Sequence, residues 1–195
     1  MTDTRFDMAR LPNYLTYARI AAIPVIMLLL LADTAPLRWL ALLLYIAAAV
    51  TDYFDGALAR KYGTVSAIGR MLDPIADKLL VGALLLVFCF DGSFGGWDLI
   101  PATIILLREI FVSGLREFMG TEKIVVPVSS LAKYKTATQL VALAVIIAEP
   151  LILGMREVSD ILLWLAAILT AITGWQYWSG ILPHLRPGEK EDDLA

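Results

Sequence analysis

Cysteine, histidine and charged residues are scarce in this chain. It has one cysteine, Cys89, and one histidine, His184, among 195 residues. A lone cysteine cannot form an intrachain disulfide or a cysteine-based metal site. Because Cys89 lies within an apolar run, we expect it to be a small buried hydrophobic residue. Only 18% of the residues are charged, and no nucleic-acid-binding signature is present, so no nucleic-acid partner is expected.

Apolar residues dominate instead. Hydrophobic residues make up 59% of the chain and the mean hydropathy is +0.73, values typical of a polytopic membrane protein and not of a soluble globular one. The length allows about six helices of roughly 20 residues each, with no room for a separate soluble domain. We therefore predict an all-α fold with six transmembrane helices in one membrane domain over residues 1–195.

The predicted helices follow from where the apolar segments begin and end. A short interfacial helix is expected within residues 1–13, and a charged, solvated tail over residues 183–195. The six spans are predicted at residues 14–31, 37–49 with a helical continuation to about 62, 70–90, 99–118, 131–148 and 158–182. Because proline is tolerated in a first helical turn, the third span is placed to start just before Pro74.

The distribution of basic residues predicts an orientation in the cell membrane. With six alternating spans, most lysines and arginines fall on one side, whereas Arg38 and Arg156 fall on the other. Both termini and the acidic stretch 52–77 are therefore predicted to face the cytoplasm. The glycine-rich segment 91–98 falls on the opposite side and has neither a P-loop ending nor a basic residue, so we expect a plain turn and not a phosphate cradle.

Four carboxylates lie between two strongly apolar segments: Asp52, Asp55, Asp73 and Asp77. Residues three or four apart share a helical face, so each pair forms an acidic face. An ionised aspartate at the middle of a membrane helix costs roughly 2.5 to 3.5 kcal/mol, so the cluster requires a compensating partner. Oxygen ligands without cysteine or histidine select Mg²⁺ or Mn²⁺, and four carboxylates can hold two such ions beside a phosphoryl group. The alternative is that these acids pair with neighbouring lysines and arginines at the helix ends.

The spacing of this stretch resembles the signature of the CDP-alcohol phosphatidyltransferase family. Every fixed position is present: Asp52, Asp55, Gly56, Ala59, Arg60, Gly69, Asp73 and Asp77. The resemblance implies a six-helix membrane enzyme that moves a phosphatidyl group from a CDP-linked lipid onto an alcohol and releases CMP. It also suggests a homodimer. It implies that the four aspartates hold the metal ions and that Asp77 also serves as general base. The positions that the family uses around the cytidine and its phosphates are matched by Gly56, Ala59, Arg60 and Gly69.

Segments 12–19, 108–117 and 129–139 resemble the phosphatidylglycerophosphate synthase branch of that family. This implies that CDP-diacylglycerol is the donor and glycerol 3-phosphate the acceptor. An acceptor that carries a phosphate needs cations, and the available ones are Arg108, Arg116, Lys133, Lys135 and Arg19. Lys133 and Lys135 lie about 200° apart on a helix, so we expect only one of them to point into a pocket.

Other interpretations stay open at this point. Arg19 lies near one end of its span, where it either reaches lipid headgroups or binds phosphate. Within the same family, the acceptor is alternatively inositol phosphate, serine or phosphatidylglycerol. A divalent-cation transporter is a different class, and it would distribute its acids across the depth of the bilayer. The third alternative, a purely structural membrane protein, does not explain the paired acids.

Overall fold

The computed structural model describes residues 11–62, 67–122, 124 and 130–185, without the side chains of residues 11–13, 53–62, 67–68 and 70. The described part is helical and contains no strand, which confirms the all-α prediction. Its elements are α2 (Leu11–Leu31), α3 (Ala35–Tyr62), α4 (Ala67–Phe90), α5 (Leu99–Thr121), α6 (Ser130–Ala148), the short 3₁₀ helix η1 (Glu149–Leu151) and α7 (Arg156–Leu185). The interfacial helix expected within residues 1–13 falls mostly outside the described residues, and α2 already begins at Leu11.

Four helices in the described residues are long and apolar enough to cross a membrane. The apolar segments are residues 14–31 of α2, 35–52 of α3, 130–151 of α6 with η1, and 156–185 of α7. Helices α4 and α5 have similar lengths, but carry charged residues where the other helices are apolar. The charged side chains that the structure describes on α4 and α5 belong to the polar sites described below.

Prolines lie inside these helices more often than the sequence indicated. Helix α4 begins at Ala67, three residues before the predicted span, and contains Pro74 in its interior, so the expectation that Pro74 lies in the first helical turn is wrong. Helix α7 likewise passes through Pro183 to Leu185, beyond the predicted end at 182. A proline removes one backbone hydrogen bond, but neighbouring helices and side chains satisfy the freed groups in membrane proteins. Proline is therefore a weak boundary signal in this chain.

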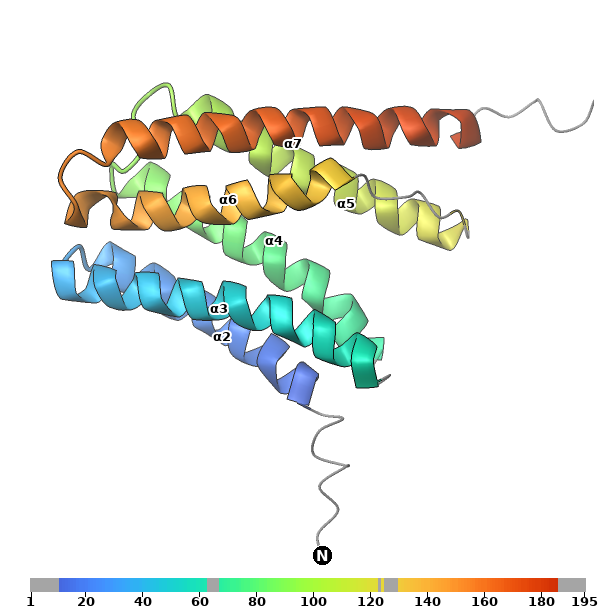
Figure 1. Ribbon diagram of the computed structural model, residues 1–195, viewed down its shortest axis with the longest axis horizontal. Helices are drawn as coiled ribbons and strands as arrows, with labels where there is room; N and C mark the ends of the chain where they lie inside the picture. Colours follow the sequence, from blue (N-terminus) through green and yellow to red (C-terminus); the bar gives the residue numbers. More distant parts are fainter. Residues whose placement is uncertain (1–10, 63–66, 123, 125–129, 186–195) are drawn as a thin grey trace, which may run out of the picture.

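The helices form two groups of three. Helices α2, α3 and α4 pack together, as do α5, α6 and α7, and the groups meet where α3 contacts α6 and α4 contacts α5 (Figure 1). The core between them is apolar and includes Leu84, Phe88 and Leu143. A polar contact also joins α3 to α6 within this core, because the buried Tyr45 hydroxyl donates to the carbonyl oxygen of Leu140 at 3.0 Å.

The outward surface is also apolar. Large side chains such as Leu43, Leu86 and Ile161 are more than 60% exposed. Cys89 is exposed as well, so the expectation that it is buried is wrong. In a membrane protein an apolar run does not indicate burial, because the lipid is as apolar as the core.

Three connections meet at one end of the molecule, at the left in Figure 1: residues 32–34, 91–98 and the segment around η1. Arg38 of α3 is 3% exposed and holds this end together. Its guanidinium donates to Asp33 Oδ1 at 3.2 Å, Asp91 Oδ2 at 3.1 Å, Ser93 Oγ at 2.9 Å and the carbonyl oxygen of Ile147 at 3.1 Å. One arginine thereby ties α3 to the α4–α5 turn and to the end of α6.

A second arginine completes this network. Arg156, at the start of α7, pairs with Asp98, with Glu149 at 3.2 Å and with Asp160 at 3.1 Å. Asp98 Oδ2 also accepts the backbone N–H of Gly95 at 2.7 Å, which closes the glycine-rich turn. Segment 91–98 is thus a turn, as predicted, but its conformation depends on arginines from α3 and α7 that its own sequence does not contain.

Candidate active site

The acidic residues of α3 and α4 meet around α2. The Thr16 hydroxyl donates to Asp73 Oδ1 at 2.6 Å. Arg19 Nη1 lies 2.5 Å from Asp52 Oδ1 and 4.0 Å from Asp77 Oδ1. Since both distances start from one nitrogen, these two carboxylate oxygens are at most 6.5 Å apart, the sum of 2.5 and 4.0 Å. Three of the four predicted aspartates therefore converge, in the halves of α3 and α4 that lie away from the Arg38 network.

Arg19 does not reach the headgroups. It is 3% exposed and pairs with Asp52, so the headgroup interpretation is wrong. A guanidinium between two carboxylates offsets part of their mutual repulsion. This position makes Arg19 a countercharge for the acidic cluster, and it does not line the cationic pocket described below.

The other signature residues are described only in part. The backbone of α3 is helical through Tyr62, so Asp52 and Asp55 lie three residues apart on a continuous helix, as predicted. The side chains of Asp55, Ala59 and Arg60 lie outside the described residues, and Gly56 is known only as a position on α3. Gly69, in the first turn of α4, is buried.

The donor set of this cluster fits a hard divalent cation. Asp52, Asp73 and Asp77 offer only oxygen atoms, and the Asp52 and Asp77 side chains are 38% and 55% exposed. Mg²⁺ and Mn²⁺ prefer such ligands and retain water molecules that an open site accommodates. Among the described side chains, which do not include that of Asp55, no three acidic, histidine or cysteine residues lie close enough together to enclose an ion.

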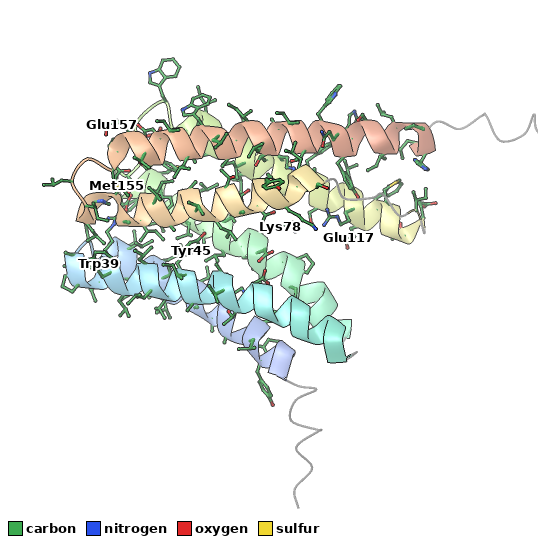
Figure 2. All side chains as sticks on the ribbon, viewed as in Figure 1. Trp39, Tyr45, Lys78, Glu117, Met155 and Glu157 are labelled. Carbon is green, nitrogen blue, oxygen red and sulfur yellow. The ribbon has the colours of Figure 1, made fainter. Side chains whose placement is uncertain are left out.

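A cationic pocket of about 320 Å³ lies between α4 and α5, next to the acidic cluster. Its charged lining residues are Lys78, Arg108, Glu109, Arg116 and Glu117. Figure 2 labels Lys78 of α4 and Glu117 of α5, which mark its two walls. Lys78 directly follows Asp77 in the sequence, and adjacent helical residues point about 100° apart. The acidic cluster and the cationic pocket thus occupy neighbouring faces of α4.

One carboxylate holds two cations at the inner side of this pocket. Glu109 Oε1 lies 3.3 Å from Arg108 Nη1 and also contacts Lys135 Nζ of α6. Lys135 is 6% exposed, whereas Lys133 is exposed, which confirms that the two lysines point in different directions. Of the two lysines, Lys135 is the one that contacts Glu109, a residue that lines the pocket.

Helix α7 contacts the arginines of the pocket from behind. Arg108 Nη2 donates to Thr173 Oγ1 at 3.3 Å, and the guanidinium of Arg116 lies 5.6 Å from the centre of the Tyr177 ring. Sequence reasoning found both arginines but missed Lys78, Glu109 and the α7 residues. The sequence does indicate Lys78 and Glu109, because each directly follows a predicted site residue, Asp77 and Arg108 respectively. No feature of the sequence indicates the α7 residues.

The chain belongs to the CDP-alcohol phosphatidyltransferase family, whose model matches residues 9–172. This confirms the family that the spacing of residues 52–77 indicated, and with it an enzyme class.

Within the family, the chain is similar to proteins named CDP-diacylglycerol–glycerol-3-phosphate 3-phosphatidyltransferase. It is 49% identical to the one from Rickettsia bellii over 171 residues, which cover 86% of this chain and 93% of that protein. It is 38% identical to the one from Cereibacter sphaeroides over 214 residues, which cover 90% of this chain and 97% of that protein. It is 37% identical to the one from Bacillus subtilis over 186 residues, which cover 88% of this chain and 95% of that protein.

Proposed function

We propose that this protein transfers a phosphatidyl group from CDP-diacylglycerol to glycerol 3-phosphate, giving phosphatidylglycerophosphate and CMP. The observation that carries the proposal is the adjacency of two sites on α4: Asp77 belongs to the acidic cluster and Lys78 lines the cationic pocket. A donor diphosphate needs cations bound by acids, and an acceptor that carries a phosphate needs a cationic pocket beside it. The names and coverage of the relatives support this pair of substrates.

The acidic cluster is the proposed donor site. Asp52, Asp55, Asp73 and Asp77 would hold two Mg²⁺ or Mn²⁺ ions, which when bound neutralise the diphosphate and polarise its phosphorus. Thr16 and Arg19 hold the described aspartates in place from α2. The CDP moiety is assigned, by resemblance, to the remaining signature positions: Gly56, Ala59, Arg60 and Gly69.

The cationic pocket is the proposed acceptor site. Lys78, Arg108 and Arg116 line this pocket. Lys135 of α6 adds a fourth positive charge next to it, because it contacts the lining residue Glu109. Lys133 is exposed and suits lipid headgroups better than the acceptor. Arg19 was grouped with the acceptor cations on sequence grounds, but its pairing with Asp52 favours a role in the acidic cluster.

The proposed reaction joins the two sites. Asp77 accepts the proton of the acceptor hydroxyl, whose oxygen forms a bond to the lipid-bearing phosphorus. The bond between that phosphorus and the CMP oxygen breaks, and CMP leaves with the electron pair. The Asp77 side chain is 55% exposed, so it is accessible to a hydroxyl held in the neighbouring pocket.

We further propose that all six long helices cross the cell membrane and that the acidic end faces the cytoplasm. The described charged side chains of α4 and α5 belong to the acidic cluster or the cationic pocket, so they do not prevent these helices from spanning. The excess of lysine and arginine at the acidic end supports this orientation. A homodimer is proposed from the family resemblance alone.

The acceptor assay tests the proposal directly. Purified protein with CDP-diacylglycerol and Mg²⁺ is given glycerol 3-phosphate, inositol phosphate, serine or phosphatidylglycerol, and CMP release is measured. We expect release with glycerol 3-phosphate, loss on chelation of the metal, and recovery on adding Mg²⁺ or Mn²⁺. Release with serine but not with glycerol 3-phosphate would contradict the proposal. Metal flux into liposomes without any CMP release would instead favour a cation transporter.

A further inference from the structure

Helix α7 lines no part of the cationic pocket, yet it contacts two of the pocket's arginines. Its residues Thr173, Gly174 and Tyr177 are buried and face α5. Thr173 and Tyr177 are four residues apart, so they lie on one face of the helix. We call this set the α7 face.

Thr173 fixes the direction of Arg108. Its hydroxyl accepts from Arg108 Nη2 at 3.3 Å and itself donates to the carbonyl oxygen of Leu169 at 2.8 Å. Because the hydroxyl proton is used within α7, the oxygen lone pairs are presented to the guanidinium. Arg108 is thus held between Thr173 on α7 and Glu109 on its own helix.

Gly174 provides the space through which Arg108 passes. A β-carbon at this position would lie 2.9 Å from Arg108 Cγ, 3.5 Å from its Nε and 3.8 Å from its Cδ. The three nearest atoms all belong to Arg108, and Cγ is close to the base of that side chain. A methyl group here therefore displaces the arginine stem or separates α5 from α7.

Tyr177 supports Arg116 in a similar way. Its ring lies 5.6 Å from the Arg116 guanidinium, within range of a cation–π contact. The ring is buried in a small cluster with Val112, Met119 and Ile181, so its position is fixed by packing.

We propose that the α7 face positions Arg108 and Arg116 for the phosphate of the acceptor and thereby sets the affinity for an anionic acceptor. This inference rests on the proposed function. Thr173, Gly174 and Tyr177 are positioning residues, because they act through the two arginines and do not line the pocket. The match to the family model ends at residue 172, directly before this face, so the face lies outside the part of the chain that the model matches.

The test compares matched variants by the Michaelis constants for the two substrates. We expect Gly174→Ala to raise KM for glycerol 3-phosphate about tenfold or more, because a displacement of about 1 Å costs that much in a positioned site. Thr173→Val should raise it about two- to tenfold, the value of one hydrogen bond, and Thr173→Ser should restore it. KM for CDP-diacylglycerol should stay within about twofold in each variant. Gly120→Ala is the control, because a β-carbon there meets no atom within 4 Å.

A double-mutant cycle separates positioning from general packing. In an Arg108→Ala background, Gly174→Ala should have no further effect on KM for glycerol 3-phosphate, because the atoms it would displace are gone. The same rise in both backgrounds, or equal rises for both substrates, would overturn the inference. So would an active wild-type enzyme whose KM for glycerol 3-phosphate is unchanged by both Gly174→Ala and Thr173→Val. The proposed function fails on a different result, a wild-type protein that releases no CMP with glycerol 3-phosphate.

Discussion

Replacing Glu109 by glutamine should destabilise the protein more than replacing the lysine that it binds. Glu109 contacts both Arg108 and Lys135, and among the described residues no other carboxylate pairs with either cation. The three side chains are only 14%, 15% and 7% exposed, respectively. The substitution therefore leaves two adjacent, poorly solvated positive charges without an anion.

The expected magnitudes follow from that asymmetry. Leaving a buried charge without its partner costs about 3 to 5 kcal/mol, so Glu109→Gln should lower the melting temperature by roughly 6 to 20 °C. Lys135→Met leaves Glu109 paired with Arg108 and keeps an apolar side chain of similar length. Its cost should be about 1 to 3 kcal/mol. Glu117→Gln is the matched control, since Glu117 is exposed on the same helix and should change stability by less than about 0.5 kcal/mol.

The assay is thermal unfolding of the purified protein in detergent, first without substrates. Glu109→Gln should unfold at the lowest temperature of the single variants, and the double variant should lose less than the singles together. Added glycerol 3-phosphate should then raise the melting temperature of Glu109→Gln more than that of the wild type, because the phosphate replaces the missing anion. A cost of Lys135→Met equal to that of Glu109→Gln, or single effects that add to within about 0.5 kcal/mol, would contradict this assignment of the charges.

Three further predictions address the remaining sites. Asp77→Asn should depress turnover strongly while CDP-diacylglycerol binding with Mg²⁺ survives better than in Asp52→Asn; equal loss of binding would leave Asp77 as a metal ligand only. Arg38→Met should lower the free energy of unfolding by about 3 to 5 kcal/mol, because it leaves the Asp91 carboxylate, which is 5% exposed, without its arginine partner. A loss below about 1 kcal/mol in a denaturant titration would contradict this. Lys135→Ala should raise KM for glycerol 3-phosphate about tenfold, whereas Lys133→Ala should leave it within about twofold; similar effects of both in the CMP-release assay would count against the assigned pocket.

The helices and the family were largely readable from the sequence. Apolar runs of about 20 residues mark membrane helices because each helix must satisfy its own backbone hydrogen bonds in lipid. The predicted helix limits agree with the observed ones to within about three residues, although α4 and α7 contain Pro74 and Pro183 in their interiors. The signature in residues 52–77 is also local, since its spacing depends only on positions along two neighbouring helices.

The partners of the site residues depended on tertiary structure. The sequence placed Arg19 on a membrane helix, but only the packing of α2 between α3 and α4 brought it to Asp52. Helical geometry separated Lys133 from Lys135, and only the contact of α6 with the rest of the bundle decided that Lys135 is the buried one.

Arg108 contacts Thr173, which lies 65 residues further along the chain, and the adjacent Gly174, and no local pattern signals either contact. Helical periodicity says which residues share a face. Which faces meet is decided by side-chain packing between distant helices, so the sequence determined the fold class, the family and the acidic cluster, and the tertiary structure decided how the cations beside it are held.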